Sequence, residues 1–157
     1  VKGNLARKAA GGDRDVARDI LAGICDIGIA NAYYVGRMKN SEEGSEQRQW
    51  GDAIQVVRPV FASAEDGGTH VNISGGAIAA NAPNRDNAVM LLEYLVSDEA
   101  QSMYAMANYE YPVKAGVALD PVVASFGEMK IDGLPLTEVA RHRRQASELA
   151  DKVGFDN

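Results

Sequence analysis

Apolar residues near the start of the chain recur every three or four positions, the spacing that places them on one face of a helix. This pattern predicts a helix that begins with Asp13 as its N-cap and ends near Gly23. The run CDIGIA, residues 25–30, is short and bounded by polar positions, so it is predicted to be a strand buried on both faces. A helix that leads into a buried strand is typical of a parallel α/β sheet, and another helix is expected from Tyr33. The apolar face of the first helix is Val16, Ala17, Ile20, Leu21 and Ile24.

Three further helices are predicted over residues 84–96, 97–107 and about 137–153. Ser97 is expected to cap the second of them, and Gly154 to end the third. The buried side of the helix over residues 84–96 is predicted to be Ala88, Met90, Leu91, Leu92 and Leu95.

The segments between the helices differ in polarity. Residues 40–52 are rich in Glu, Gln, Ser and Gly and are predicted to be an exposed connection. An extended segment is expected at 53–62 and a turn at 65–68. Residues 70–83 read as a strand, and the glycine pair within them indicates a backbone that other atoms approach closely.

Composition excludes several classes of protein. The formal net charge of −6 disfavours general nucleic-acid binding. The single cysteine, Cys25, excludes an internal disulfide and a multi-cysteine metal site, and its apolar neighbours predict a buried, inert thiol. No apolar stretch approaches the roughly 20 residues that a membrane span requires. Because the sequence opens without Met, we expect a piece of a longer protein.

Tyr33 and Tyr34 lie side by side where the predicted strand ends and the next helix begins. Ligands of open α/β sheets bind at the carboxyl ends of strands, and the N–H groups of a helix start stabilise anions. A phenol must lose its proton to bind a metal strongly, so a hard and strongly polarising cation such as ferric iron suits this pair. The alternative is that both rings are packing residues, one facing the core and one facing the next element.

Nothing in the sequence resembles an enzyme active site. Nucleophilic catalysis needs a Ser or Cys beside a base, and the only histidines are His70 and His142. His142 lies among arginines on the last predicted helix, which indicates a solvated face, and His70 has no evident partner. We therefore expect a binding protein and not an enzyme.

Four stretches carry a family resemblance: NLARKAAGGDRDVARDILAGICDIGIANAYYVGRM, VNISGGAIAANAPNRDNAVMLLEYLVSDEAQSMYA, NYEYPV and the closing helix to KVGF. They resemble the carboxyl-terminal half of the periplasmic ferric-iron-binding proteins, the substrate-binding components of bacterial iron ABC transporters. The most specific elements are Asn-x-Tyr-Tyr at residues 31–34 and Glu-Tyr-Pro-Val at residues 110–113.

The resemblance implies an α/β fold of the type II periplasmic-binding-protein (venus-flytrap) class. This chain would hold most of the second lobe and a piece of the first. By the same resemblance, residues 1–61 belong to the second lobe, residues 62–107 to the first, and residues 108–157 to the second again as its carboxyl-terminal helices.

The resemblance also implies a site between the lobes for Fe(III). Tyr33 and Tyr34 match the adjacent tyrosinate ligands of the family. Asn31 matches a residue that in some members contacts a synergistic anion, carbonate or phosphate. Tyr111 and Pro112 match a structural motif near a lobe crossover and are not expected to be ligands. The implied role is delivery of iron to an ABC permease from the periplasm.

The chain departs from the family in length. Its relatives are considerably longer, and their remaining iron ligands lie upstream of the residues printed here. A chain without that half would expose apolar helix surface, so we expect association with the missing amino-terminal half or a domain-exchanged dimer.

Two other classes of protein remain open. One is a periplasmic binding protein for a non-metal solute, such as a polyamine, thiamine or an organic anion, in which the tyrosines stack. The other is an effector-sensing regulatory domain, although no helix-turn-helix motif is present in the opening residues.

Overall fold

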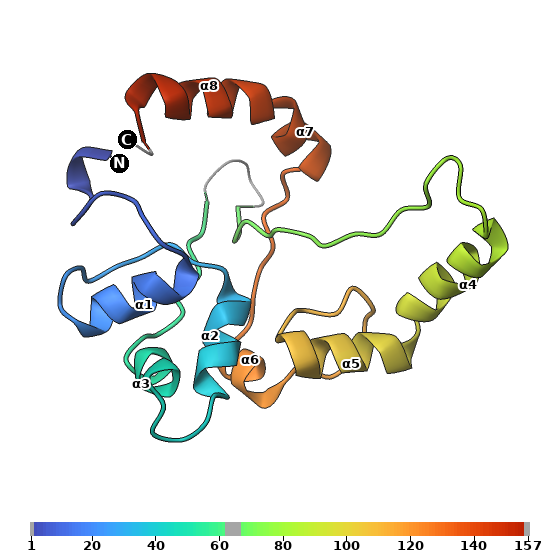
Figure 1. Ribbon diagram of the computed structural model, residues 1–157, viewed down its shortest axis with the longest axis horizontal. Helices are drawn as coiled ribbons and strands as arrows, with labels where there is room; N and C mark the ends of the chain where they lie inside the picture. Colours follow the sequence, from blue (N-terminus) through green and yellow to red (C-terminus); the bar gives the residue numbers. More distant parts are fainter. Residues whose placement is uncertain (1, 62–66, 156–157) are drawn as a thin grey trace.

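The computed structural model describes residues 2–61 and 67–155. Figure 1 shows helices joined by long irregular segments, with the two ends of the chain close to each other. The described elements are a 3₁₀ turn, η1 (Lys2–Asn4), and the α-helices α1 (Asp13–Leu21), α2 (Ala32–Lys39), α3 (Glu46–Asp52), α4 (Arg85–Leu95), α5 (Asp98–Asn108), α6 (Pro121–Ser125), α7 (Leu136–Arg141) and α8 (Arg143–Val153).

The predicted strands are not formed within the described residues. Pairing there is limited to two isolated bridges, Phe61 with Gly68 and Thr69 with Ile131. The predictions of a strand at 25–30 and of another at 70–83 are therefore wrong for this chain as it stands. A strand needs hydrogen-bonded neighbours, and the described segments do not supply them. Predicted boundaries at residues 62 to 66, including the first half of the turn, lie outside the described residues.

Segment 25–30 is nevertheless asymmetric, as a strand would be. A Cβ on Gly28 would lie 2.0 Å from a methyl carbon of Val16, so this side of the segment rests on α1. Ile27 and Ile29, which alternate with Gly28, are 87% and 91% exposed. One face of the segment is thus covered by a helix and the opposite face is open to solvent, which corrects the prediction of burial on both sides.

Helices with local sequence signals occur where predicted. α2 begins one residue before its predicted start, and α4 and α5 match their predicted ranges within one residue. The Ser97 hydroxyl accepts a hydrogen bond from the Ala100 N–H at 3.2 Å. Gly154 ends α8 in the left-handed conformation. Two details differ. Gly12, not Asp13, is the N-cap of α1, and the long final helix is divided at His142 into α7 and α8.

Two short helices were not predicted. α3 lies in the polar stretch that was expected to be a connection, and the Ser45 hydroxyl caps it by accepting from the Arg48 N–H. α6 begins with Pro121 after Asp120, whose carboxylate accepts from the N–H of Val122 at 2.8 Å. Both carry a cap residue, Ser45 or Asp120, as a local signal in the sequence, but each helix is too short to show an apolar period.

The described core is built around α2. This helix contacts α1, α3, α5 and α6, and its buried residues are Val35, Gly36 and Met38. A Cβ on Gly36 would lie 2.5 Å from Cβ of Tyr109, and one on Gly51 of α3 would lie 2.9 Å from the backbone of Lys39. These glycines let the neighbouring elements approach α2 closely, so α2 is held firmly in place.

The buried carboxylate of Asp19 ties α1 to the amino-terminal segment through an ion pair with Arg7, and it also pairs with Arg18 of α1 itself. Burial raises the pKa of Asp19, but the hydrogen bonds and charges of the two arginines outweigh it and hold this pKa below its ordinary value. A lowered folded-state pKa stabilises the fold above the pKa of the unfolded carboxyl, and that stabilisation is lost as the pH falls through the folded-state value.

Replacing Arg7 by Met is therefore expected to lower Tm by several degrees at neutral pH, because Asp19 loses its closer partner. The difference from the parent should shrink in acid, where Asp19 takes up a proton in both proteins. Thermal melts followed by circular dichroism across this pH range check the prediction. Arg144→Met, which breaks an exposed pair with Glu148, is the matched control and should leave Tm nearly unchanged. A difference that persists unchanged in acid would contradict the assignment.

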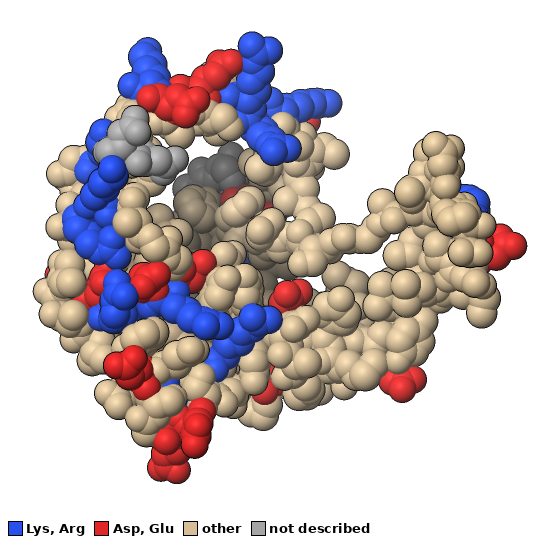
Figure 2. All heavy atoms as spheres, viewed as in Figure 1, with Lys and Arg blue, Asp and Glu red and all other residues tan. Residues whose placement is uncertain are grey.

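Much apolar surface lies open. The chain exposes 11564 Å² of solvent-accessible surface, whereas a folded monomer of this mass is expected to expose about 7,600 Å². Figure 2 shows few charged side chains over the arm formed by residues 67–84 and α4. Met90 and Leu91, predicted to be buried, are exposed on this arm, as is Ile73. Cys25 is only partly buried.

No helix among residues 2–61 and 67–155 is long and apolar enough to cross a membrane.

Candidate metal centre

The two tyrosines lie in the first turn of α2, and their rings face each other. The ring centroids are 4.3 Å apart and the planes are tilted by 31°. The Tyr34 N–H donates to the Asn31 carbonyl at 3.2 Å, which closes the first helical turn. Both side chains are partly exposed. The geometry brings two phenols together on the helix that the rest of the described core holds in place.

An arginine lies over each ring. The guanidinium carbon of Arg37, one turn further along α2, is 5.3 Å from the centroid of Tyr33. That of Arg14, from α1, is 5.7 Å from the centroid of Tyr34. The Nε of Arg14 is buried and has no hydrogen-bond partner within the described part of the chain. Each tyrosine of the pair therefore has a guanidinium group packed against its ring.

The pKa of Tyr33 is raised above its ordinary value. The hydrogen bond with Tyr34 contributes most, followed by burial, and the charges of Tyr34 and Asp13 act in the same direction. The charge of Arg37 acts in the opposite direction and is the smaller effect. The neighbouring phenol and the negative charge of Asp13 thus both act against ionisation of Tyr33.

Asp13 joins the starts of the two helices. Its Oδ1 accepts from the backbone N–H of Asn31 at 2.6 Å and from the side-chain amide of Asn31 at 3.2 Å. The local capping of α1 is left to Asp15, whose Oδ2 accepts from the Gly12 N–H at 2.8 Å. The carboxylate of Asp13 is therefore turned away from its own helix and lies at the amino end of α2.

Asn31 is hydrogen-bonded to a carboxylate of the protein itself. Its backbone N–H and its side-chain amide are both directed at Oδ1 of Asp13. The contact of Asn31 with a separate carbonate or phosphate stays a prediction.

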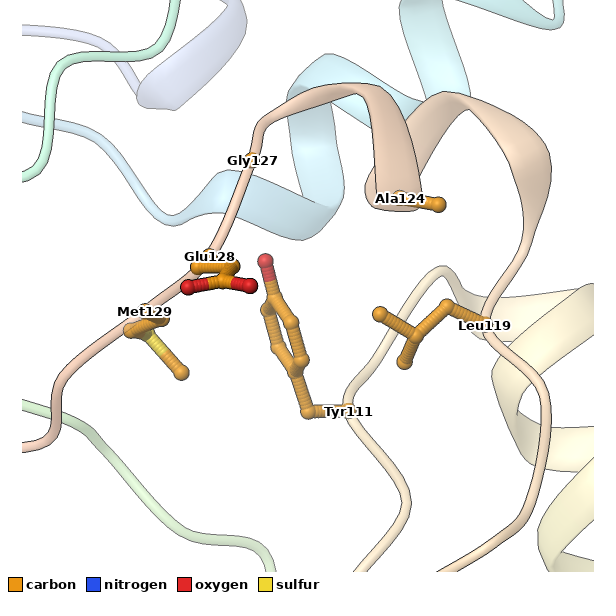
Figure 3. Close-up of a pocket in the computed structure, with 6 residues that line it drawn as sticks. All are labelled: Tyr111, Leu119, Ala124, Gly127, Glu128 and Met129. Carbon is orange, nitrogen blue, oxygen red and sulfur yellow. The ribbon is translucent and has the colours of Figure 1, made fainter.

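The other tyrosines belong to other segments of the chain, and Tyr109 packs against Gly36 of α2. Tyr94 and Tyr104 are exposed on α4 and α5. Tyr111 lines an open hollow of about 440 Å³ together with Leu119, Ala124, Gly127, Glu128 and Met129 (Figure 3). Its hydroxyl is hydrogen-bonded to Arg58, which also donates to the Gly127 carbonyl. Tyr111 thus ties two distant segments together, in agreement with the structural role expected for it.

Histidine and cysteine do not form an alternative centre. Among residues 2–61 and 67–155, no three His, Cys, Asp or Glu side chains are grouped so as to hold a metal ion. His70 and His142 are both exposed. The sequence did not single out Arg14 and Arg37 as neighbours of the pair. The spacing of four between Tyr33 and Arg37 could have indicated their contact on one helix face, whereas the contact between Arg14 and Tyr34 bridges two helices.

Comparisons with known proteins define the class to which this arrangement belongs. No family model matches the chain. It is 42% identical to iron uptake protein A2 of Synechocystis sp. over 98% of its own length and 44% of that protein. The Bordetella ferric binding protein is similar in structure, with a TM-score of 0.90 and 74% identity over 100% of this chain and 49% of the other. A Trichodesmium protein solved in complex with iron and citrate ligands follows, with a TM-score of 0.87 and 41% identity over 98% and 48%.

The chain is therefore homologous over its whole length to the ferric-iron-binding proteins, as the sequence motifs predicted. It spans about half the length of the relatives it matches.

Proposed function

We propose that this chain supplies one side of a ferric-iron site, in which Tyr33 and Tyr34 bind Fe(III) as tyrosinates. The observation that carries the proposal is the pair of phenol rings 4.3 Å apart at the start of α2, in a chain homologous to ferric-binding proteins. Phenolate oxygens are hard donors and match a hard trivalent cation. The nearby guanidinium groups of Arg14 and Arg37 help to accommodate two negative charges side by side.

Further ligands must come from outside the described residues. Two phenolates leave positions open on a six-coordinate ion, and no three His, Cys, Asp or Glu side chains of the described chain are grouped so as to hold a metal ion by themselves. We place the remaining ligands in the other half of the protein, whose lobe closes over the tyrosines. Residues 1–61 and 108–157 would then form the second lobe, and residues 62–107 would belong to the first.

The role that follows is capture and delivery, not catalysis. Ligands that arrive from both lobes favour the closed form, and a membrane permease can recognise that form. We propose that the complete protein works in the periplasm as the iron-binding partner of an ABC permease. The homologues named for iron uptake support this role.

An iron titration of a completed protein tests the proposal. In this protein the 157 residues replace the corresponding half of the Bordetella ferric binding protein, to which they are 74% identical. Binding of Fe(III) is expected to produce a visible absorption band from tyrosinate-to-iron charge transfer, with one ion bound per protein. A colourless protein that binds a polyamine, thiamine or an organic anion would favour the non-metal alternative and contradict the proposal.

A further inference from the structure

We propose that the carboxylate of Asp13 is the protein's own anion at the iron site and takes the place beside Asn31 that carbonate or phosphate would otherwise fill. This inference rests on the proposed function of the tyrosine pair. It makes iron binding by this protein independent of an external anion at Asn31.

The first argument is the direction of the hydrogen bonds. Asn31 offers two donors at the start of α2, its backbone N–H and its side-chain amide, and both reach the same oxygen, Oδ1 of Asp13. An oxyanion bound by the same two donors would have the same contacts. Within the described part of the chain, no hydrogen bond is recorded for the second oxygen, Oδ2, which leaves it available to a cation.

The second argument is the position of Asp13 in its own helix. A carboxylate in the first turn of a helix usually stabilises that turn, and Asp15 does so here through the Gly12 N–H and Arg18. Asp13 instead bridges 18 residues of sequence to Asn31 and brings the positive ends of α1 and α2 to one point. The tyrosine pair begins two residues after this point.

The third argument is charge and chemistry. The hydrogen bonds to Asn31 hold the Asp13 carboxylate two residues before Tyr33, and the neighbouring Arg14 lies with its guanidinium carbon 5.7 Å from the ring centroid of Tyr34. Two tyrosinates and one carboxylate carry three negative charges, equal to the charge of Fe(III). A carboxylate oxygen is a hard donor of the same kind as carbonate or phosphate oxygen, so the substitution keeps the donor type.

The test compares iron affinity with and without added anion in the completed protein. Iron is supplied as a ferrous salt oxidised in air in buffer free of carbonate and phosphate, and the visible band reports binding. The parent is expected to bind with the same affinity whether or not bicarbonate or phosphate is added. Asp13→Asn keeps the shape and the acceptor oxygen but removes the charge. It should bind about 10- to 100-fold more weakly without anion and recover most of that loss when either anion is added.

Asp15→Asn is the matched control, because it removes the same charge from the same helical turn without touching Asn31. It should bind iron like the parent under both conditions. If Asp13→Asn fails to fold, Asn31→Ala provides the second test, since it removes one of the two donors that hold Asp13. Asn31→Ala should also bind iron more weakly than the parent. Added anion should restore less of its iron affinity than is expected for Asp13→Asn.

Three results would overturn the inference. They are a parent whose affinity rises on addition of either anion, an Asp13→Asn variant that binds like the parent without anion, and a loss in this variant that no anion restores. In each of these cases the tyrosinate band of the parent can still be present, so the proposed iron site survives. Loss of that band from the parent itself would overturn the proposed function as well.

Discussion

Replacing Tyr33 and Tyr34 together by Phe should abolish the visible band of the iron-loaded completed protein and weaken Fe(III) binding by at least roughly 100-fold, the upper end of what loss of one outer-shell partner costs a metal site. Phe keeps the ring and its packing but removes the oxygen donor. The two rings stack at 4.3 Å through their faces, so the double variant should retain the fold around α2. Iron titration with visible absorption measures the effect, and a thermal melt checks the fold.

The matched control is the pair of tyrosines on α4 and α5. Tyr94 and Tyr104 are exposed and lie apart from the pair, so their double replacement by Phe removes the same number of hydroxyl groups from the protein. This control should bind iron like the parent. Undiminished iron uptake by the Tyr33/Tyr34 variant would show that the phenol oxygens are not ligands.

The second large effect concerns the open surface of the chain. The 157 residues alone are expected to bind a hydrophobic dye and to self-associate, and to form a one-to-one complex when the complementary half of the Bordetella ferric binding protein is added. The exposed area exceeds that of a folded monomer of this mass by about 4,000 Å². Obligate interfaces bury about 2,000 to 5,000 Å² summed over both partners, or about 1,000 to 2,500 Å² of each, so the excess on this one chain is more than enough for an obligate interface.

Sedimentation velocity and dye fluorescence measure this effect. Ile27→Asp places a charge on the open face of segment 25–30, where the side chain is 87% exposed, and should prevent the complex without altering the helix content of the isolated chain. Thr137→Asp, at an exposed polar position in the first turn of α7, is the control and should leave the complex intact. A compact monomer of the isolated chain at high concentration, with no dye binding, would contradict the prediction.

Most helices could be predicted because their signals are local. The capping hydroxyl of Ser97 and the left-handed Gly154 act on the helical turn in which they occur. The local sequence was therefore enough to predict the start of α5 and the end of α8. α3 and α6 were missed because a helix of seven or five residues shows no complete apolar period, and only its cap remains as a signal.

The strands could not be predicted in the same way. The run CDIGIA has the composition of a buried strand, but a strand exists only when another segment pairs with it. Gly28 rests on Val16 as the apolar pattern requires, while Ile27 and Ile29 face solvent because the described residues offer no neighbour. The apolar pattern thus shows that the segment is suited to a strand, and the presence or absence of a pairing segment determines whether the strand forms.

The same division applies to the site. The adjacency of Tyr33 and Tyr34, their place at a helix start and the suitability of phenolate for ferric iron follow from the residues in order. The contact of Asp13 with Asn31 and the position of Arg14 over Tyr34 join residues 18 and 20 positions apart, and they arise from the packing of α1 against α2. No local period encodes such contacts, because they depend on how two helices meet in space. For this reason the adjacent pair of phenols could be foreseen from the sequence, whereas the carboxylate bonded to Asn31 could not.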